Sequence, residues 1–136
     1  MPVKTGRWVN PREADDGLRV LICRFRPRGL PRAEETWDVW IKELAPSEAL
    51  HGDFYGKRGT PITLDTYRQR FLEEMASAQP RLRELAERVA RGETVTLLCS
   101  KTCLLEAACH RSIVRDLIEA ELRRLVEPQG QSPATG

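Results

Sequence analysis

Two short apolar segments, LRVLIC at residues 18–23 and TVTLLC at residues 94–99, constrain the fold of this chain most strongly. Each is too short for a core helix and rich in branched aliphatic residues, so each is predicted to be a buried strand. Segments with helical periodicity separate and follow them. Strands that alternate with helices predict an α/β fold, with a mostly parallel sheet and helices packed on it.

The helical segments have apolar residues on one face and turn residues at their ends. They predict helices at residues 34–44, 64–78, 80–91 and 112–126. In the first of these, large apolar residues recur at helical spacing and are interpreted as a core stripe: Trp37, Trp40, Ile41 and Leu44. Residues 47–62 hold three glycines and are predicted to be a loop with about one helical turn, in which His51 is a solvated surface residue.

The length of 136 residues fits one domain, which we place at residues 1–127, with 128–136 as a disordered tail. The first residues contain no apolar run of the kind that a secretory signal has, and no apolar segment is long enough to span a membrane. A cytoplasmic location without membrane association is therefore expected. There the four cysteines should be reduced thiols and not a disulfide framework.

Positive charge gathers near the N-terminus, although the net charge is only +2. Residues 1–32 hold eight Lys or Arg against three Asp or Glu. Arg24, Arg26 and Arg28 lie directly after the first predicted strand, where prolines and a glycine indicate a loop. A loop of this kind suits a small anionic ligand. Nucleic acid is an alternative that we do not favour, because the chain has no recognisable nucleic-acid motif.

Three of the four cysteines lie between residues 99 and 109, after the second predicted strand. Cys109 stands at or just before the start of the last predicted helix, where unpaired N–H groups and the helix dipole favour a thiolate. With His110 as proton handler and Arg111 as anion clamp, Cys109 is the candidate nucleophile. Adjacent residues on a helix point in different directions, so the sequence does not require Cys109 and His110 to touch.

Two other uses of the cysteines stay open. Zinc or an iron cluster would use Cys99, Cys103, Cys109 and His110, but one CxxxC pair followed by an adjacent Cys-His is a weak ligand pattern. We therefore predict no cofactor and no metal. In the other interpretation Cys99 and Cys103 are small buried residues of a turn, as we expect for Cys23 on the first strand.

Four motifs occur in order along the chain: RVLICRFRPRG (19–29), DVWIKELAPS (38–47), TYRQRFLEEM (66–75), and VTLLCS with CHRS (95–100 and 109–112). In this order they resemble the bacterial and archaeal family catalogued as domain of unknown function 488, over residues 18–126. The resemblance implies a compact α/β domain and no settled activity. The family's loop more often has a tryptophan at the position of Arg26 and an aspartate at that of Cys23, so the loop of this chain is more suited to anions.

The loops after the two predicted strands should face one crevice, because the carboxyl ends of parallel strands meet at one edge of a sheet. The leading hypothesis is an anion-binding crevice with thiol-dependent chemistry on a phosphate-, sulfate- or carboxylate-bearing substrate. Its residues would be Arg24, Arg26, Arg28, Cys99, Cys109, His110 and Arg111. The competing hypotheses are a non-catalytic module that binds anions, nucleic acid or protein, and a structural metal-binding protein. The sequence alone does not decide whether the chain is an enzyme.

Overall fold

The computed structural model describes residues 3–100 and 109–126. Within these ranges, four strands form one sheet in the order β1-β4-β2-β3, and every strand pair is parallel. The strands are β1 (Val3–Arg7), β2 (Leu18–Leu21), β3 (Val39–Trp40) and β4 (Val95–Cys99). The helices are α1 (Glu48–Phe54), α2 (Leu64–Met75), α3 (Gln79–Ala90) and α4 (His110–Val126), with 3-10 turns η1 (Arg32–Glu34), η2 (Lys42–Leu44) and η3 (Ala76–Ala78). The predicted α/β class is confirmed.

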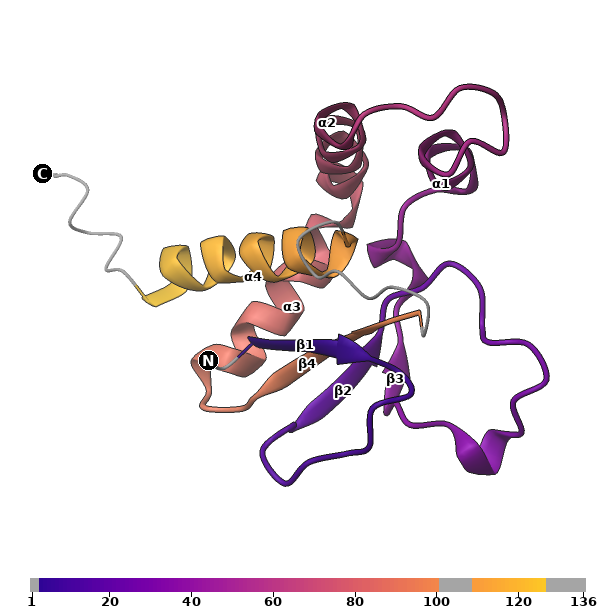
Figure 1. Cartoon of the computed structure of the whole chain (residues 1–136). Helices are drawn as coiled ribbons and strands as arrows, with labels where there is room; N and C mark the ends of the chain where they lie inside the picture. The colour runs from indigo at the N-terminus through magenta and orange to yellow at the C-terminus, as the bar shows by residue number, and fades with distance from the viewer. Residues whose placement is uncertain (1–2, 101–108, 127–136) are drawn as a thin grey trace, which may run out of the picture.

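The central strand is β4, which pairs with β1 on one side and with β2 on the other. All five of its residues are buried, which explains why TVTLLC is apolar without alternation. Val95 and Leu97 belong to the same hydrophobic cluster as Val20 of β2 and Phe71 of α2. The described helices cover this face of the sheet (Figure 1).

The opposite face of the sheet is covered by loops. Leu21 and Leu98 pack there against Trp37, which comes from the segment before β3. On the same strand as Leu21, the buried guanidinium of Arg19 donates a hydrogen bond of 2.7 Å to the carboxylate of Asp16. This ion pair satisfies a charge that would otherwise be buried without a partner. The domain is therefore a helical layer on a sheet, with irregular chain on the other side.

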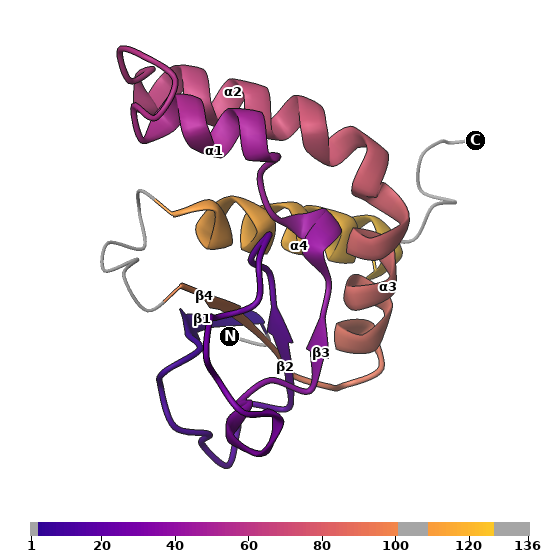
Figure 2. The same ribbon diagram turned by 90° about the vertical axis from the view of Figure 1, so that its right-hand side faces the viewer.

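Helix α1 is fixed at its start by Ser47. The Ser47 hydroxyl accepts a hydrogen bond from the Leu50 N–H, and the Ser47 N–H donates to the carboxylate of Glu74 on α2 over 2.8 Å. This contact places α1 beside α2, as Figure 2 shows. Among the helices that the structure describes, none combines the length and hydropathy needed to cross a membrane.

The predicted helix at residues 34–44 is wrong. Val39 and Trp40 form the edge strand β3, which pairs with β2. Trp37 is buried on the loop-covered face, whereas Ile41 and Leu44 belong to the cluster on the helical face. The apparent helical stripe is therefore an extended segment that crosses the sheet edge from one face to the other, and edge pairing has overridden the periodicity.

The remaining differences are smaller. Strand β1 was not predicted, because VKTGR has no apolar run; it is an edge strand paired only with β4 in the described sheet. Residues 48–54 form a helix longer than the single turn that we expected. The helices predicted at 64–78, 80–91 and 112–126 are confirmed, with α4 beginning two residues earlier at His110. The predicted tail at 128–136 lies outside the described residues.

Candidate functional site

A cavity of about 380 Å³ lies at the carboxyl edge of the sheet. Trp8 follows β1, Cys23 lies after β2 and Ser100 follows β4, and all three line the cavity. Cys109 and His110 line it from the start of α4. The volume is within the range of small-molecule sites. The loops after the two predicted strands thus meet at one cavity, as parallel pairing requires.

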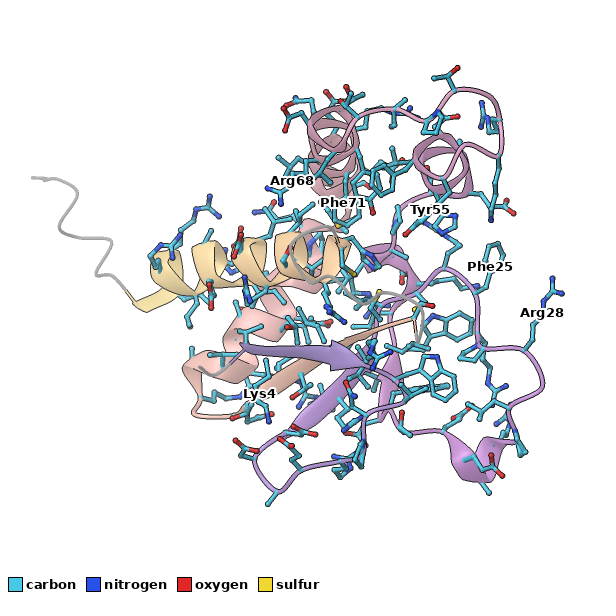
Figure 3. The ribbon with its side chains drawn as sticks, in the orientation of Figure 1. Lys4, Phe25, Arg28, Tyr55, Arg68 and Phe71 are labelled. Carbon is cyan, nitrogen blue, oxygen red and sulfur yellow. The ribbon has the colours of Figure 1, made fainter. Side chains whose placement is uncertain are left out.

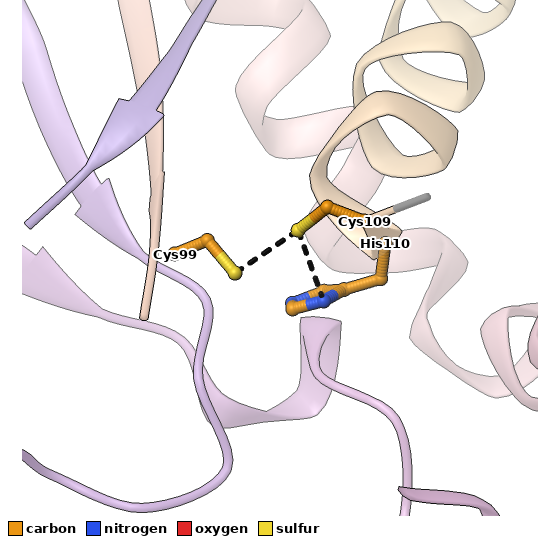
Figure 4. A group of neighbouring side chains, drawn as sticks. All are labelled: Cys99, Cys109 and His110. Carbon is orange, nitrogen blue, oxygen red and sulfur yellow. Dashed lines mark hydrogen bonds between the residues drawn. The ribbon is translucent and has the colours of Figure 1, made fainter. Parts of the chain in front are cut away.

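His110 connects the start of α4 to the chain after β2. Its Nε2 atom lies 2.6 Å from the carbonyl oxygen of Ile22. A carbonyl oxygen can only accept, so Nε2 carries the hydrogen and donates it. In the neutral ring the lone pair is therefore on Nδ1, which lies 3.8 Å from Sγ of Cys109 (Figure 4). The ring of Phe71 packs edge-on against the imidazole at 5.7 Å and supports this orientation.

Cys109 lies directly before the first residue of α4, so its side chain is free of the helical spacing that would direct it away from His110. The Cys109 carbonyl accepts a hydrogen bond from the Ser112 N–H, at 3.2 Å, and the Arg111 N–H lies 3.5 Å from Sγ of Cys109. Cys109 therefore occupies the capping position of α4, and its sulfur lies close to the Arg111 N–H at the start of the helix. This N–H group and the helix dipole both favour a negative charge on that sulfur.

Cys99 is the last residue of β4, and its Sγ lies 3.0 Å from Sγ of Cys109 (Figure 4). Both residues are buried, at 2% and 3% exposure, and both line the cavity. No disulfide joins Cys23, Cys99 and Cys109, the cysteines that the structure describes. Cys103, the other cysteine of the predicted site, lies outside the described residues.

A metal could in principle use the three donor atoms of Cys99, Cys109 and His110, which lie within 4.8 Å of one another. Thiolate and imidazole are the ligands that zinc prefers. However, the two sulfur atoms are 3.0 Å apart, whereas two thiolates on one tetrahedral zinc lie roughly 3.8 Å apart. The three groups therefore form a compact dithiol and imidazole cluster, in which the two sulfur atoms lie closer together than two thiolates on one zinc ion would.

The arginines of the loop after β2 differ in what they contact. Arg24 lines the cavity, and its guanidinium donates to the backbone carbonyls at 45 and 46, each over 3.2 Å. Arg26 pairs with the carboxylate of Glu35 at 2.7 Å and does not line the cavity. Arg28 is exposed and points away from the molecule (Figure 3). Only Arg24 of the three is therefore placed to contact a ligand in the cavity.

Arg111 is buried at 6% exposure and does not line the cavity. One of its terminal nitrogens donates to the Gly6 carbonyl over 2.8 Å, so its side chain ties α4 to β1. Of the predicted site residues, the structure brings together at the cavity Arg24, Cys99, Cys109 and His110. It does not bring there Arg26, Arg28 and Arg111.

One wall of the cavity, which α1 and the turn after it supply, was not predicted from the sequence. Glu48, His51, Tyr55 and Lys57 all line the cavity. The His51 ring packs against Tyr55 with centroids 4.6 Å apart; burial, and then the charge of Lys57, lower the pKa of His51 below its usual value. The available signal was the density of polar and aromatic side chains in HGDFYGK, because loops with such residues often carry binding sites.

Comparisons with known proteins give a family for the whole described domain. The family model of the active DUF488-N3 subclade matches residues 3–122. The uncharacterised protein YeaO of Escherichia coli K12 is 33% identical over 100 residues, which cover 74% of this chain and 84% of YeaO. The uncharacterised proteins Mb3100c of Mycobacterium bovis and Rv3073c of Mycobacterium tuberculosis are each 31% identical over 88 residues, 63% of this chain and 72% of each relative. No solved structure is significantly similar to this chain.

Proposed function

This chain belongs to the DUF488 family, in its active DUF488-N3 subclade, and on that premise we propose that it is a thiol-dependent enzyme acting on a small substrate with an anionic group. The observation that carries the proposal is the path of contacts from the Ile22 carbonyl through His110 to Cys109, at the wall of a cavity. The description of the subclade as active accords with a chemical role for the cavity.

Cys109 is the nucleophile in this proposal. Nδ1 of His110 accepts the thiol proton, while Nε2–H remains bonded to the Ile22 carbonyl. The Arg111 N–H and the dipole of α4 stabilise the thiolate that forms. A sulfur lone pair then attacks an electrophilic atom of the substrate, and the imidazolium returns the proton to the leaving group. The triad-like order of nucleophile, base and orienting acceptor is the arrangement that such catalysis requires.

The anionic group of the substrate is held by Arg24. Its guanidinium donates hydrogen bonds to two backbone carbonyls, and it takes part in none of the ion pairs found among the described residues. Lys57 also lines the cavity. Among the described lining residues, Arg24 and Lys57 thus carry two positive charges, and Glu48 carries one negative charge. A phosphate, sulfate or carboxylate would therefore be attracted to the cavity. Tyr55 and Phe25, which are labelled in Figure 3, also line the cavity, and their exposed rings offer apolar surface to the rest of the substrate.

The test uses two small alkylating agents that differ in charge. Neutral iodoacetamide and anionic iodoacetate are each reacted with the protein at a series of pH values, and each cysteine is quantified by mass spectrometry. Cys109 should react with both agents faster at neutral pH than Cys23, a thiol that lines the same cavity without a described histidine contact. Iodoacetate should gain an additional advantage at Cys109 from Arg24.

Matched variants separate the two parts of the proposal. Arg24→Gln should slow iodoacetate several-fold and leave iodoacetamide unchanged, whereas Arg28→Gln, outside the cavity, should alter neither rate. Cys109→Ser should abolish the fast reaction. A Cys109 that reacts no faster than Cys23 would contradict the nucleophile. An iodoacetate rate that is the same in Arg24→Gln would contradict the anion site.

A further inference from the structure

Cys99 has no role in the proposed nucleophilic mechanism, although it contacts the nucleophile directly. Its sulfur lies 3.0 Å from that of Cys109 (Figure 4), and both residues line the same cavity. Cys99 ends the central strand and Cys109 caps α4, so two rigid elements hold the thiols together. Two buried thiols in contact beside an imidazole base form a dithiol site that can be oxidised reversibly.

We propose that Cys99 and Cys109 are a redox pair, in which Cys99 converts an oxidised Cys109 into a disulfide. The proposal rests on the proposed function in taking Cys109 as the more reactive thiol. In the disulfide, Cys109 has no free thiol and cannot act as the nucleophile. Reduction by a dithiol would restore the Cys109 thiol. Cys99 would also keep Cys109 from the irreversible sulfinic and sulfonic acids, because disulfide formation competes with further oxidation.

The reaction is balanced with a hydroperoxide as oxidant. The Cys109 thiolate attacks one oxygen of hydrogen peroxide, the O–O bond breaks, and hydroxide leaves and takes up the proton that His110 received. Cys109 is then a sulfenic acid. The Cys99 sulfur attacks Sγ of Cys109, the S–S bond forms, the S–OH bond breaks, and hydroxide leaves with the Cys99 proton as water. In sum, two thiols and one peroxide give a disulfide and two waters.

The burial of the pair selects the kind of oxidant. At 2% and 3% exposure, Cys99 and Cys109 are reached through a cavity of about 380 Å³. Hydrogen peroxide enters such a cavity, whereas the disulfide of another folded protein does not reach its wall. Closing the disulfide requires the two sulfur atoms to approach by roughly 1 Å, from contact distance to a bond of about 2.05 Å.

The experiment follows the pair in a background where the other two cysteines are replaced, Cys23→Ser with Cys103→Ser. The protein is treated with hydrogen peroxide, remaining thiols are blocked with N-ethylmaleimide, and tryptic peptides are read by mass spectrometry. Cleavage at Arg91, Lys101 and Arg111 puts Cys99 and Cys109 on different peptides, 92–101 and 102–111. We expect these peptides to become linked, with both thiols lost together and both recovered after dithiothreitol.

The matched control adds Cys99→Ala, which replaces a small buried residue by another, with circular dichroism as the folding check. In this variant peroxide should give a Cys109 sulfenic acid that dimedone traps, followed by sulfinic acid that dithiothreitol does not reverse. If Cys99→Ala does not fold, the same comparison is made with Cys99→Ser. Equal accumulation of Cys109 sulfinic acid with and without Cys99 would overturn the proposal.

The outcomes separate this inference from the proposed function. If Cys109 is alkylated rapidly but peroxide never links peptides 92–101 and 102–111, the redox pair is rejected and the nucleophile stands. If the peptides become linked while Cys109 is alkylated no faster than Cys23, the nucleophile is rejected and the redox pair stands. A third outcome is that the peptides become linked only after a chelator has released stoichiometric zinc from the protein. In that case Cys99, Cys109 and His110 form a metal site, and the redox pair is rejected.

Discussion

The carbonyl oxygen of Ile22 accepts a hydrogen bond from Nε2 of His110, 88 residues away in the chain, over 2.6 Å. This bond joins the end of β2 to the start of α4. It also sets which imidazole nitrogen faces Cys109. A neutral histidine with this contact presents its lone pair to the thiol, and a ring free to rotate would not do so consistently.

Replacing the base should therefore slow the reaction of Cys109. In His110→Asn, the rate of iodoacetamide alkylation at Cys109 near neutral pH should fall about tenfold, toward that of a thiol with an ordinary pKa of about 8.5. The rate at Cys23, measured in the same sample, serves as the internal reference. Equal Cys109 rates in the parent and in His110→Asn would show that His110 does not act on this thiol.

The buried pair of Asp16 and Arg19 should make the domain sensitive to acid. Burial alone would raise the pKa of the Asp16 carboxyl, but hydrogen bonds from the Glu13 N–H, Lys4 and Arg19 outweigh it and hold that pKa below its ordinary value of 3.8. A carboxyl with a depressed pKa contributes stability that is present above 3.8 and is lost as the pH falls through the lower folded value.

The matching variant is Asp16→Asn. It should lower the free energy of unfolding at neutral pH by about 3 kcal/mol, because the Arg19 guanidinium is left buried without its carboxylate. Urea unfolding curves at neutral pH and below 4 provide the measurement. The difference between parent and variant should shrink at the acidic end. A constant difference across the whole pH range would contradict the assigned role of the Asp16 charge.

Gly17 allows β2 to begin close to β4. Its φ is +62°, and an added Cβ would lie 2.1 Å from the Thr94 carbonyl oxygen, which accepts a hydrogen bond from the Leu18 N–H. Gly17→Ala therefore combines a steric clash with backbone strain. It should destabilise the domain severely or prevent folding.

Gly29 is the control for this effect. Its φ is +71°, but nothing lies within 4 Å of an added Cβ. Gly29→Ala should therefore cost only the backbone strain, about 1 kcal/mol. The two variants are compared by thermal and urea unfolding. Similar losses of stability in both would mean that the close approach to Thr94 does not determine the effect at Gly17.

His51 should titrate below the usual histidine value of 6.5, because burial and then the Lys57 charge both lower its pKa. The chain has two histidines, so His51 can be identified in proton NMR spectra as the signal that remains in His110→Asn. In Lys57→Gln its pKa should rise but stay below 6.5, since burial is the larger cause. A titration of His51 unchanged by Lys57→Gln would contradict this assignment.

The sign of the effect of His51 on stability follows from the same shift. Below 6.5 the unfolded chain binds a proton that the folded His51 resists, so this residue removes stability as the pH falls from 6.5 toward the folded value. Above 6.5 it has no such effect. His51 is therefore a neutral ring in the cavity wall at neutral pH. The sequence had predicted a solvated surface residue there, in a loop with about one helical turn, whereas the structure places His51 within α1.

Local signals in the sequence were enough for the central part of the fold. Three correct predictions depend on residues that are close together in the chain. They are the strands β2 and β4, the helices α2, α3 and α4, and the position of Cys109 at a helix start. The family assignment, made from motifs at residues 18–126, is likewise confirmed. Burial of a continuous apolar run and the capping of a helix need no knowledge of distant segments.

Tertiary structure decided the rest. Strands β1 and β3 form because they pair with the neighbouring strands β4 and β2. Neither VKTGR nor VW predicts a strand from its own residues. The cavity likewise depends on contacts between segments that are far apart in the chain or separated by a loop. These are the contact of His110 with Ile22, the contact of Cys99 with Cys109, and the wall formed by α1.

Residue types in a sequence show which chemistry is available. Which side chains meet depends on the packing of whole elements, and this packing placed Arg24 at the cavity, paired Arg26 with Glu35, and left Arg28 in solvent.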